Sequence, residues 1–313
     1  MTTSSATLPF IRKLQGWIAL ARPPFHTVGI LPFALGAVMA YQATSTFPWA
    51  LWGWGTLAVV LIMLSTYLAG EYFDYEGDRI SRQVNPNRFA GGSGVFPAGL
   101  LERKGALVAS VVALALAAVV GLVIWLGYRT GPWTIPLGLI GMIGGFFYSV
   151  PPIRWAARGV GELWIAFCYG WLPVAVAYYL PVGRFDPLVH WVSIPIAATI
   201  FNVILLNEYP DYVADQATAK RNLLVRLGLE KGARVFAAAH ILGWLGMAAS
   251  VAAGVPARTL LFYAPIFLIS LGLVVAVLRG VYHHPRRLEM ACGLNILVNL
   301  GTTLAYILGF LMG

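Results

Sequence analysis

The sequence predicts an all-α, polytopic membrane protein with nine transmembrane helices. Of its 313 residues, 59% are apolar and only 11% are charged, and the mean hydropathy is +0.77, whereas soluble domains carry about 25% charged residues. Nine apolar runs have the length that a helix needs to cross the hydrocarbon core, roughly 20 residues. None alternates apolar and polar residues as the strands of a membrane barrel do. The composition therefore excludes soluble, disordered and disulfide-rich classes.

The predicted helices form one domain over residues 1–313. Arg22 marks the start of the first apolar run, acidic motifs follow the second and the sixth, and Arg154 and Arg158 follow the fourth. In chain order the runs occupy residues 24–42, 50–70, 105–127, 132–149, 160–180, 188–208, 235–254, 259–279 and 290–311.

Basic residues test this count, because the cytoplasmic loops of membrane proteins are enriched in Lys and Arg. With the amino terminus in the cytoplasm, 18 of the 21 Lys and Arg residues fall on the cytoplasmic side, and only Arg129, Arg184 and Arg258 fall on the other. The bias predicts a cytoplasmic amino terminus and an outward carboxyl terminus in the inner (plasma) membrane. The net charge of +9 is then explained by topology and an anionic ligand, and nucleic acid is not an expected partner.

An acidic motif occurs twice, after the second and after the sixth predicted span. Residues 70–78 read GEYFDYEGD and residues 207–215 read NEYPDYVAD, so that E-Y-x-D-Y-x-x-D recurs 137 residues apart. The equivalent places of the two copies predict a duplication of four helices, with repeats at about 24–149 and 160–279 and an added ninth helix at 290–311. The two copies face the same side, unlike the inverted repeats of many transporters.

Helical spacing places the acids of each motif on one face. At about 100° per residue, Glu71, Asp74 and Asp78 fall within an arc of about 60°, and the second copy behaves likewise. A carboxylate at the bilayer centre costs about 2.5–3.5 kcal/mol, so these acids are expected in a wet cavity at the cytoplasmic boundary. Facing carboxylates are typical of Mg²⁺ bridged to a diphosphate. The candidate catalytic and metal-binding residues are Asp74, Asp78, Asp211 and Asp215, with Glu71 and Glu208 as further metal ligands.

Two features of these motifs leave alternatives open. Acids that merely cap helix ends and pair with neighbouring Arg are a plainer interpretation, which two copies in register disfavour. Gly77 and Pro210 weaken the helix inside the motifs, and either free backbone carbonyls as ligands or mark where the helix ends.

Basic residues near the motifs are candidates to balance a diphosphate. Arg22 begins the first span, while Lys220 and Arg221 follow Asp215 closely. Residues 85–94, NPNRFAGGSG, carry Arg88 in a Gly-rich loop. Its consecutive backbone N–H groups would suit an anion nest, and a flexible loop is an equal interpretation.

The motifs together resemble those of the UbiA superfamily of intramembrane prenyltransferases. The likeness covers most of the chain and is carried by ARPPFHTVGILPFALG (21–36), EYFDYEGD (71–78), NRFAGGSG (87–94), YSVPPIRWAARGVGEL (148–163) and NEYPDYVADQATAKRNLLVRLG (207–228). The GGSG loop, YSxPPxR and KRxLxVRLG segments are most similar to 1,4-dihydroxy-2-naphthoate prenyltransferases of menaquinone synthesis. One position departs from the family, since both motifs usually begin with Asn and here only Asn207 does, with Gly70 in the first.

The resemblance implies a UbiA-like helical bundle and a Mg²⁺-dependent reaction. A polyprenyl diphosphate loses its diphosphate, and an aromatic acceptor attacks the resulting allylic cation inside a dry, aromatic cavity. Asn207 joins Arg22, Arg88, Lys220 and Arg221 in the implied diphosphate site. The implied substrate rim consists of Tyr72, Tyr148, Ser149 and Arg154.

Other functions share these features. Homogentisate, 4-hydroxybenzoate, haem and glyceryl lipids are alternative acceptors for the same diphosphate site. A membrane transporter is the alternative outside enzymes, but it would need ionisable residues along a path between both faces, and here the acids lie at one end.

Overall fold

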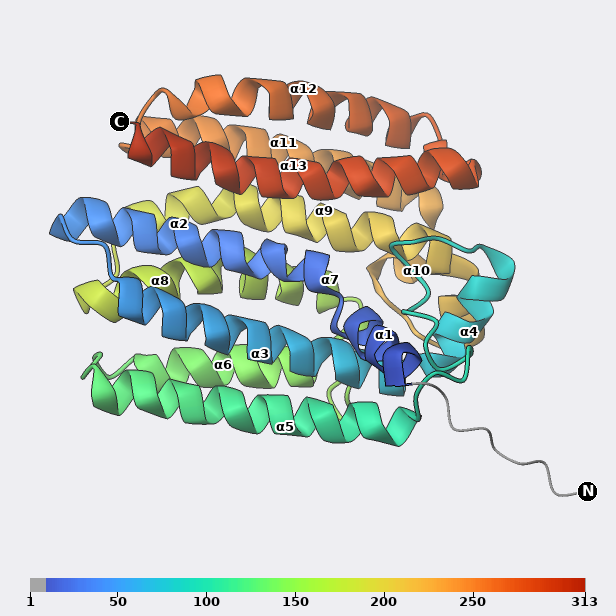
Figure 1. Ribbon diagram of the computed structural model, residues 1–313. Helices are drawn as coiled ribbons and strands as arrows, with labels where there is room; N and C mark the ends of the chain where they lie inside the picture. The colour runs from blue at the N-terminus through green and yellow to red at the C-terminus, as the bar shows by residue number, and fades with distance from the viewer. Residues whose placement is uncertain (1–9, 313) are drawn as a thin grey trace, which may run out of the picture.

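The computed structural model describes residues 10–312 and contains helices and no strands over that range. Its long helices lie side by side and form a bundle (Figure 1). The predicted all-α membrane class is confirmed, since eight helical stretches are long and apolar enough to cross a membrane. They are Phe10–Thr44, Trp49–Phe73, Arg103–Gly127, Gly161–Val182, Pro187–Ala217, Leu229–Ala252, Thr259–Leu278 and Pro285–Leu311. The predicted cytoplasmic amino terminus lies outside the described residues.

The first stretch is not one straight helix. It contains α1 (Phe10–Ala21), the 3₁₀ turn η1 (Pro23–His26) and α2 (Thr27–Thr44). Arg22 between them has a left-handed backbone with φ of 47°, which turns α1 away from the direction of the bundle (Figure 1). Pro23 and Pro24 follow this residue and lack the N–H groups that would continue the α-helix. The turn fixes Arg22 at the end of the bundle where the acidic motifs lie.

The fourth predicted span, 132–149, is shorter than expected. Only α6 (Thr134–Phe146) is helical there, and 13 residues of helix measure about 20 Å against a hydrocarbon core of about 30 Å. Turns continue the chain from Phe147 to Ser149. The predicted count of nine crossings therefore stays a prediction, while the other predicted runs each correspond to one of the eight long stretches.

The remaining elements complete the bundle and cover one end of it. The π-helical turns η2 (Val123–Gly127) and η4 (Ala166–Trp171) extend α5 and separate α7 from α8. Two short helices, α4 and α10, lie at the end of the bundle where α1 begins (Figure 1). The elements not bounded above are α3 (Trp49–Phe73), α4 (Tyr75–Val84), α5 (Arg103–Leu122), η3 (Trp155–Ala157), α7 (Gly161–Ile165), α8 (Leu172–Val182), α9 (Pro187–Ala217), α10 (Leu223–Leu227), α11 (Leu229–Ala252), α12 (Thr259–Leu278), η5 (Val281–His283) and α13 (Pro285–Leu311).

The two acidic motifs differ in backbone. The first is divided, because α3 ends at Phe73 and α4 begins at Tyr75, with Asp74 between them at φ −96° and ψ 6°. The second lies entirely on α9, which continues through Pro210. Pro210 has no N–H for the carbonyl of Leu206, and the thiol of Cys292 donates to that carbonyl at 3.8 Å. Neither Gly77 nor Pro210 therefore ends its helix, and the break falls at Asp74.

α9 is the central helix of the half that carries the second motif. It packs against α11, α13, η4 and α4, and Ile196, Leu205 and Leu206 on it are fully buried. Contact with α4 matters for the site, because α4 carries the end of the first motif. Packing of one helix on the other brings two segments that are far apart in the sequence to the same end of the bundle.

Candidate active site

Glu71, the first acid of the first motif, is buried and fully bonded. Its carboxylate accepts a hydrogen bond from Arg22 Nη2 at 2.7 Å, from the backbone N–H of Ser93 at 2.7 Å and from Ser93 Oγ at 2.8 Å. The carboxylate thus ties the end of α3 to the turn before α2 and to the Gly-rich loop. These contacts indicate that Glu71 holds Arg22 and the Gly-rich loop in position.

Asp74 lies at the break between α3 and α4. Ser149 Oγ donates to one carboxylate oxygen at 2.6 Å, and Arg154 Nη2 donates to the other at 3.0 Å. Two of the residues expected at the substrate rim therefore meet the first motif, on a segment that follows α6. Arg154, like Arg22, has a left-handed backbone, with φ of 49°.

Asp78, on α4, faces the Gly-rich loop. The Cα of Gly92 lies so close to its carboxylate that a Cβ there would clash with it. Burial raises the pKa of Asp78 well above its usual range, and the neighbouring carboxylates of Asp74, Glu71 and Asp211 raise it further. No Lys or Arg among residues 10–312 forms an ion pair with it in this structure. Asp78 thus lies where several negative charges converge.

The second motif is held by residues from both halves of the chain. Asp211 accepts hydrogen bonds from Ser81 Oγ on α4 and from the backbone N–H of Gly91, the latter at 3.4 Å. Asp215 accepts from Asn222 Nδ2 at 2.7 Å and forms an ion pair with Lys220 Nζ at 3.3 Å. The first of these bonds joins α4 directly to α9.

Glu208 lies deeper in the same helix. It is 8% exposed, and its Oε2 atom has no hydrogen-bond partner among the described residues. Asn207 Oδ1 is likewise buried without a partner. Both side chains line the same cavity. Glu208 lies within hydrogen-bond reach of the Glu162 carboxyl group, whereas Asn207 leaves an acceptor oxygen available to a bound molecule, which is unusual for a buried polar group.

Lys220 connects the two motifs electrostatically. Burial alone would lower its pKa, but the carboxylates of Asp215, Asp74 and Asp211 outweigh this and raise it well above the usual range. The side chain is therefore a permanent ammonium ion at neutral pH. Because Asp74 belongs to the first motif and Asp211 and Asp215 to the second, this one cation lies within the field of both.

Two cavities meet at these residues. The first, which we call the polar cavity, has a volume of about 230 Å³ and is lined by both motifs together with Arg154 and Thr218. The second, the central cavity, also measures about 230 Å³ and adds Arg22, Asn207 and five aromatic side chains. Asp74, Asp78 and Lys220 line both. The aromatic residues are Phe25, Tyr67, Phe89, Tyr148 and Tyr169.

Tyr148 lies among carboxyl groups in the central cavity. Burial raises the pKa of its phenol well above the usual value, and Glu208 and Glu162 raise it further. It therefore remains a neutral hydrogen-bond donor. Glu162 is a second buried acid of this region, 1% exposed, whose Oε1 accepts from the backbone N–H of Leu223 at 2.7 Å.

Three of the expected residues do not line these cavities. Arg88 has a side chain that is 85% exposed and pairs with Glu289 at 3.3 Å. Arg221 is exposed beside Lys220. Tyr72 packs under the guanidinium of Arg103, 5.2 Å from the ring centre. The loops and faces that carry them point elsewhere, and their proposed roles gain no support from this geometry.

Other residues of the site were not expected from the sequence. Ser81, Ser93 and Asn222 each donate to a motif carboxylate. The Gly-rich loop does present N–H groups to negative charge, but to Asp211 and Glu71 of the protein itself. Ser93 belongs to the Gly-rich loop, whereas the only signal for Ser81 and Asn222 was their place a few positions after a motif, which many surface residues share.

The donors fit a Mg²⁺ ion that is completed by substrate. Within the described residues, no three His, Cys, Asp or Glu side chains form a ready-made metal cluster, although three acids, Asp74, Glu71 and Asp211, lie close enough to raise the pKa of Asp78. Mg²⁺ is commonly held by one or two carboxylates together with substrate phosphates and water. Converging carboxylates with Arg22 and Lys220 beside them suit that arrangement, because the cations would bind the phosphate oxygens that complete the metal site.

The fold and site define a membrane-embedded enzyme whose acidic, cation-lined cavity opens at one end of a helical bundle and becomes aromatic inside. The chain belongs to the UbiA prenyltransferase family, whose profile matches residues 30–299. It is therefore a prenyltransferase, and the resemblance seen in its motifs is confirmed.

Several relatives act on naphthoate compounds, according to their names. The 2-carboxy-1,4-naphthoquinone phytyltransferase of Synechocystis sp. is 28% identical over 90% of this chain and 89% of its own. The 1,4-dihydroxy-2-naphthoate octaprenyltransferase of Bacillus subtilis is 25% identical over 75% of this chain and 73% of its own.

Solved structures share the fold. A UbiA homologue from Aeropyrum pernix superposes with a TM-score of 0.68 at 16% identity, covering 90% of this chain and 97% of that one. A UbiA homologue from Archaeoglobus fulgidus bound to DMAPP and Mg²⁺ gives 0.64 at 15% identity, covering 93% and 98%.

Proposed function

We propose that this protein transfers a polyprenyl group from a polyprenyl diphosphate to 1,4-dihydroxy-2-naphthoate, with Mg²⁺ as cofactor, in menaquinone biosynthesis. One observation carries the proposal: the two acidic motifs meet at a shared mouth, joined by the Ser81–Asp211 hydrogen bond and by Lys220. That mouth leads from a polar cavity into an aromatic one. A charged diphosphate head on an apolar chain matches this polarity.

The residues divide between metal and diphosphate. Asp74, Asp78, Asp211 and Asp215 would hold Mg²⁺, with Glu71 and Glu208 beside them. When bound, the ion supplies positive charge to the diphosphate leaving group. Arg22, Lys220 and Asn207 line the central cavity. The two cations would neutralise diphosphate oxygens and hold them in place while the allylic C–O bond breaks.

Aromatic side chains would stabilise the allylic cation that forms when the diphosphate leaves. A carbon that becomes positive as diphosphate leaves is attracted to the faces of Tyr and Phe rings. Tyr67, Tyr148 and Tyr169 line the central cavity beyond the carboxylates. Their rings exclude water, which would otherwise capture the cation, and the neutral Tyr148 phenol can donate a hydrogen bond to an acceptor oxygen or to diphosphate.

The acceptor is proposed from the relatives. Their names share a naphthalene acceptor and differ in the prenyl group, phytyl in one and octaprenyl in the other. Gly70 lines the central cavity, and the nearest side-chain atom to a Cβ there would be Ser149 Oγ at 3.6 Å. The glycine therefore leaves room beside Asp74 for a flat bicyclic ring.

The topology completes the proposal. Under the predicted nine crossings, eighteen of the 21 Lys and Arg residues belong to one side, which supports an active site at the cytoplasmic face of the plasma membrane. The polar substrate heads would enter from the cytoplasm, and the prenylated product would leave into the bilayer.

The test is an assay of the purified protein with geranylgeranyl diphosphate, Mg²⁺ and a panel of aromatic acceptors. We expect a prenylated product from 1,4-dihydroxy-2-naphthoate, and loss of at least about 10²-fold in kcat for Asp211→Asn. Asp186→Asn is the control on the same helix, since Asp186 caps the start of α9 by accepting from Leu188 N at 2.8 Å and Asn caps equally well. Unchanged turnover in Asp211→Asn would refute the metal assignment.

The other acceptors are outcomes of the same panel. If only homogentisate or only 4-hydroxybenzoate gave a product, that compound would be the acceptor, and the proposed diphosphate site would still stand. Movement of a solute across reconstituted vesicles, with no new carbon–carbon bond, would favour the transporter instead.

A further inference from the structure

Arg103 contacts the two tyrosines on either side of Asp74. It begins α5, and its Nη2 atom donates a hydrogen bond to the backbone carbonyl of Tyr72 at 2.8 Å. Its guanidinium carbon lies 5.2 Å from the centre of the Tyr72 ring and 4.1 Å from the centre of the Tyr75 ring. Tyr72 lies in the last turn of α3, and Tyr75 is the first residue of α4. One guanidinium group therefore joins the two helices across the break at Asp74.

The hydrogen bond to Tyr72 satisfies a carbonyl group at the end of α3. A helix leaves its last four carbonyl groups without partners in the helix itself, and Tyr72 is one of the last four residues of α3, which ends at Phe73. A basic side chain suits this position, because it also interacts favourably with the negative end of the helix dipole. Arg103 thus stabilises the backbone of the first motif two residues before Asp74.

The contact with Tyr75 restrains the start of α4. A planar guanidinium group is attracted to the face of an aromatic ring, most strongly where water is partly excluded. Tyr75 is half-buried, and its ring lies 6.4 Å from that of Phe96. Because α5 packs along α3 (Figure 1), Arg103 extends from a fixed helix. Its contact with Tyr75 therefore limits the rotation of α4 about Asp74.

The charge of Arg103 is not neutralised by a carboxylate. Within residues 10–312, none of the ion pairs includes it, and its Nε atom is buried without a hydrogen-bond partner. A positive charge at this end of the bundle also contributes to the bias that predicts the topology, but the exposed Lys104 contributes equally. The contacts with the two tyrosines distinguish Arg103 from its neighbour.

We infer that Arg103 is a positioning residue, which sets the angle between α3 and α4 so that Asp74 and Asp78 face the same metal ion. The inference rests on the proposed function for the identity of that ion and its diphosphate. The backbone N–H of Asp78 donates to the backbone carbonyl of Asp74 at 3.0 Å, so the direction in which α4 leaves the break decides where Asp78 lies. Loss of the restraint would move Asp78 and leave Asp211 and Asp215 in place on α9.

The first test measures the break without metal or substrate. In Arg103→Gln, hydrogen–deuterium exchange of the amides of residues 75–84 should be at least about tenfold faster than in the wild type, because local opening costs less free energy. Lys104→Gln is the matched control, since it removes the same charge from the next residue, which is exposed. Arg103→Lys should lie between, because Lys keeps the charge but lacks the flat face. Unchanged exchange in Arg103→Gln would overturn the inference.

The second test measures the binding of Mg²⁺ with inorganic diphosphate, from the rise in melting temperature that it causes. The apparent dissociation constant should be at least about tenfold higher in Arg103→Gln, the value of one charged contact. Tyr75→Leu removes the ring face and should reproduce this effect even if Arg103→Gln does not fold. Tyr75→Phe keeps the ring and should bind as the wild type does. Wild-type affinity in Arg103→Gln or in Tyr75→Leu would overturn the inference.

These outcomes separate the two proposals. Faster exchange and weaker binding of Mg²⁺ diphosphate, in a protein that gives no prenylated product, would support the role of Arg103 and refute the proposed reaction. Prenylated product with unchanged exchange would support the reaction and refute the role of Arg103. Faster exchange with unchanged affinity would show that Arg103 stabilises α4 without positioning a metal ligand, and would also overturn the inference.

Discussion

Neighbouring residues of similar chemistry have different environments at this site. Lys220 and Arg221 were both expected to bind diphosphate, but the Lys220 side chain is 19% exposed and pairs with Asp215, which is 5% exposed, whereas Arg221 is exposed. The chain turns directly before them, since Ala219 has a left-handed backbone with φ of 54°. One sequence position thus decides whether a positive charge enters the site or stays in solvent.

Removing the Lys220 charge should affect both binding and stability. We expect Lys220→Gln to raise the KM for the prenyl diphosphate at least about tenfold, the value of one charged hydrogen bond. It should also lower the free energy of unfolding by about 3 kcal/mol, because it leaves a buried carboxylate unpaired. Arg221→Gln should change the KM by less than about twofold. Steady-state kinetics measure the KM values, and thermal unfolding in detergent measures the stability. Equal effects of the two variants would contradict the assignment of Lys220, and not Arg221, to the diphosphate site.

Asp78 gives a prediction on pH. Its pKa is raised in the folded protein, so the folded state binds this proton more tightly than the unfolded chain does. The stability that protonated Asp78 contributes is present at low pH and is lost as pH rises from the unfolded pKa, about 3.9, through the raised folded value. Without Mg²⁺ at neutral pH, Asp78→Asn should therefore raise the melting temperature, by roughly 2–4 °C for about 1 kcal/mol.

The metal reverses this effect. Mg²⁺ with diphosphate should stabilise the wild type and stabilise Asp78→Asn much less, because binding to the folded state adds to its stability. Glu230→Gln is the control, since Glu230 is exposed on α11 and lines neither the polar nor the central cavity. Melting curves in EDTA measure the effect of Asp78→Asn without metal, and melting curves with Mg²⁺ diphosphate measure how much the metal stabilises each protein. A lower melting temperature for Asp78→Asn in EDTA would show that Asp78 is not strained by its neighbours.

Among elements, the Gly-rich loop does most to join the two halves of the site. Ser93 contacts Glu71 of α3, and Gly91 contacts Asp211 of α9. Arg82 of α4 donates in turn to the carbonyls of Gly91 and Gly92. The loop is thereby fixed between the motifs, and its glycines adopt left-handed backbones that side chains rarely adopt.

Comparing alanine substitutions at Gly92 and Gly99 distinguishes the effect of backbone strain from the effect of contact with Asp78. Gly92 has φ of 65° and its Cα lies against Asp78, whereas Gly99 has φ of 67° and open space around it. Alanine at either position should cost about 1–2 kcal/mol of backbone strain. Only Gly92→Ala should also displace Asp78 and lower kcat by about 10²-fold, the effect of a misplaced reacting group. Turnover and melting temperature of the two variants measure this, and equal turnover would exclude a positioning role for the loop.

Elements differ in how well the sequence predicts them. Helices α3 and α9 and their acids follow from hydropathy and helical spacing, which are local properties. The partners of those acids do not, because Ser81, Ser93 and Asn222 reach them through turns whose direction depends on tertiary packing. Arg88 shows the same limit, since it lies in the right loop but pairs with Glu289 on α13. The break at Asp74 was also not expected, because the helical spacing of Glu71, Asp74 and Asp78 assumed a helix that runs through all three.

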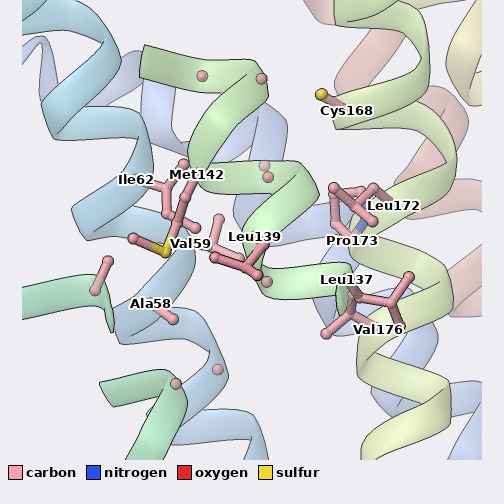
Figure 2. A pocket seen from close by; sticks show the side chains of 18 of the residues that line it. Ala58, Val59, Ile62, Leu137, Leu139, Met142, Cys168, Leu172, Pro173 and Val176 are labelled. Atoms are coloured by element: carbon pink, nitrogen blue, oxygen red, sulfur yellow. The ribbon is translucent and has the colours of Figure 1, made fainter. Parts of the chain in front are cut away.

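At the scale of the whole molecule, the bundle separates charge from hydrocarbon along its axis. The acidic motifs and their cations occupy one end and line the central cavity together with five aromatic side chains. A further cavity, lined by Ile62, Met142, Leu172 and other apolar side chains (Figure 2), contains none of the motif acids. Such a gradient matches the bilayer, whose boundary is wet and whose core is dry. An amphiphilic diphosphate can therefore keep its head hydrated and its chain buried while it reacts.

The short helix α6 makes the number of crossings a question for experiment. The beginning of α1 and the end of α13 lie at opposite ends of the bundle (Figure 1), as an odd number of crossings requires. Arg129 and Arg158 flank α6 and both are exposed, so that single cysteines there report on its two ends. If α6 crosses, a membrane-impermeant maleimide should label Arg129→Cys in intact cells and label Arg158→Cys only after permeabilisation.

The native Cys168 and Cys292 lie within the bundle and should contribute little background. Labelling of both positions from the same side would reduce the crossings to eight and leave the excess of positive charge without its present explanation.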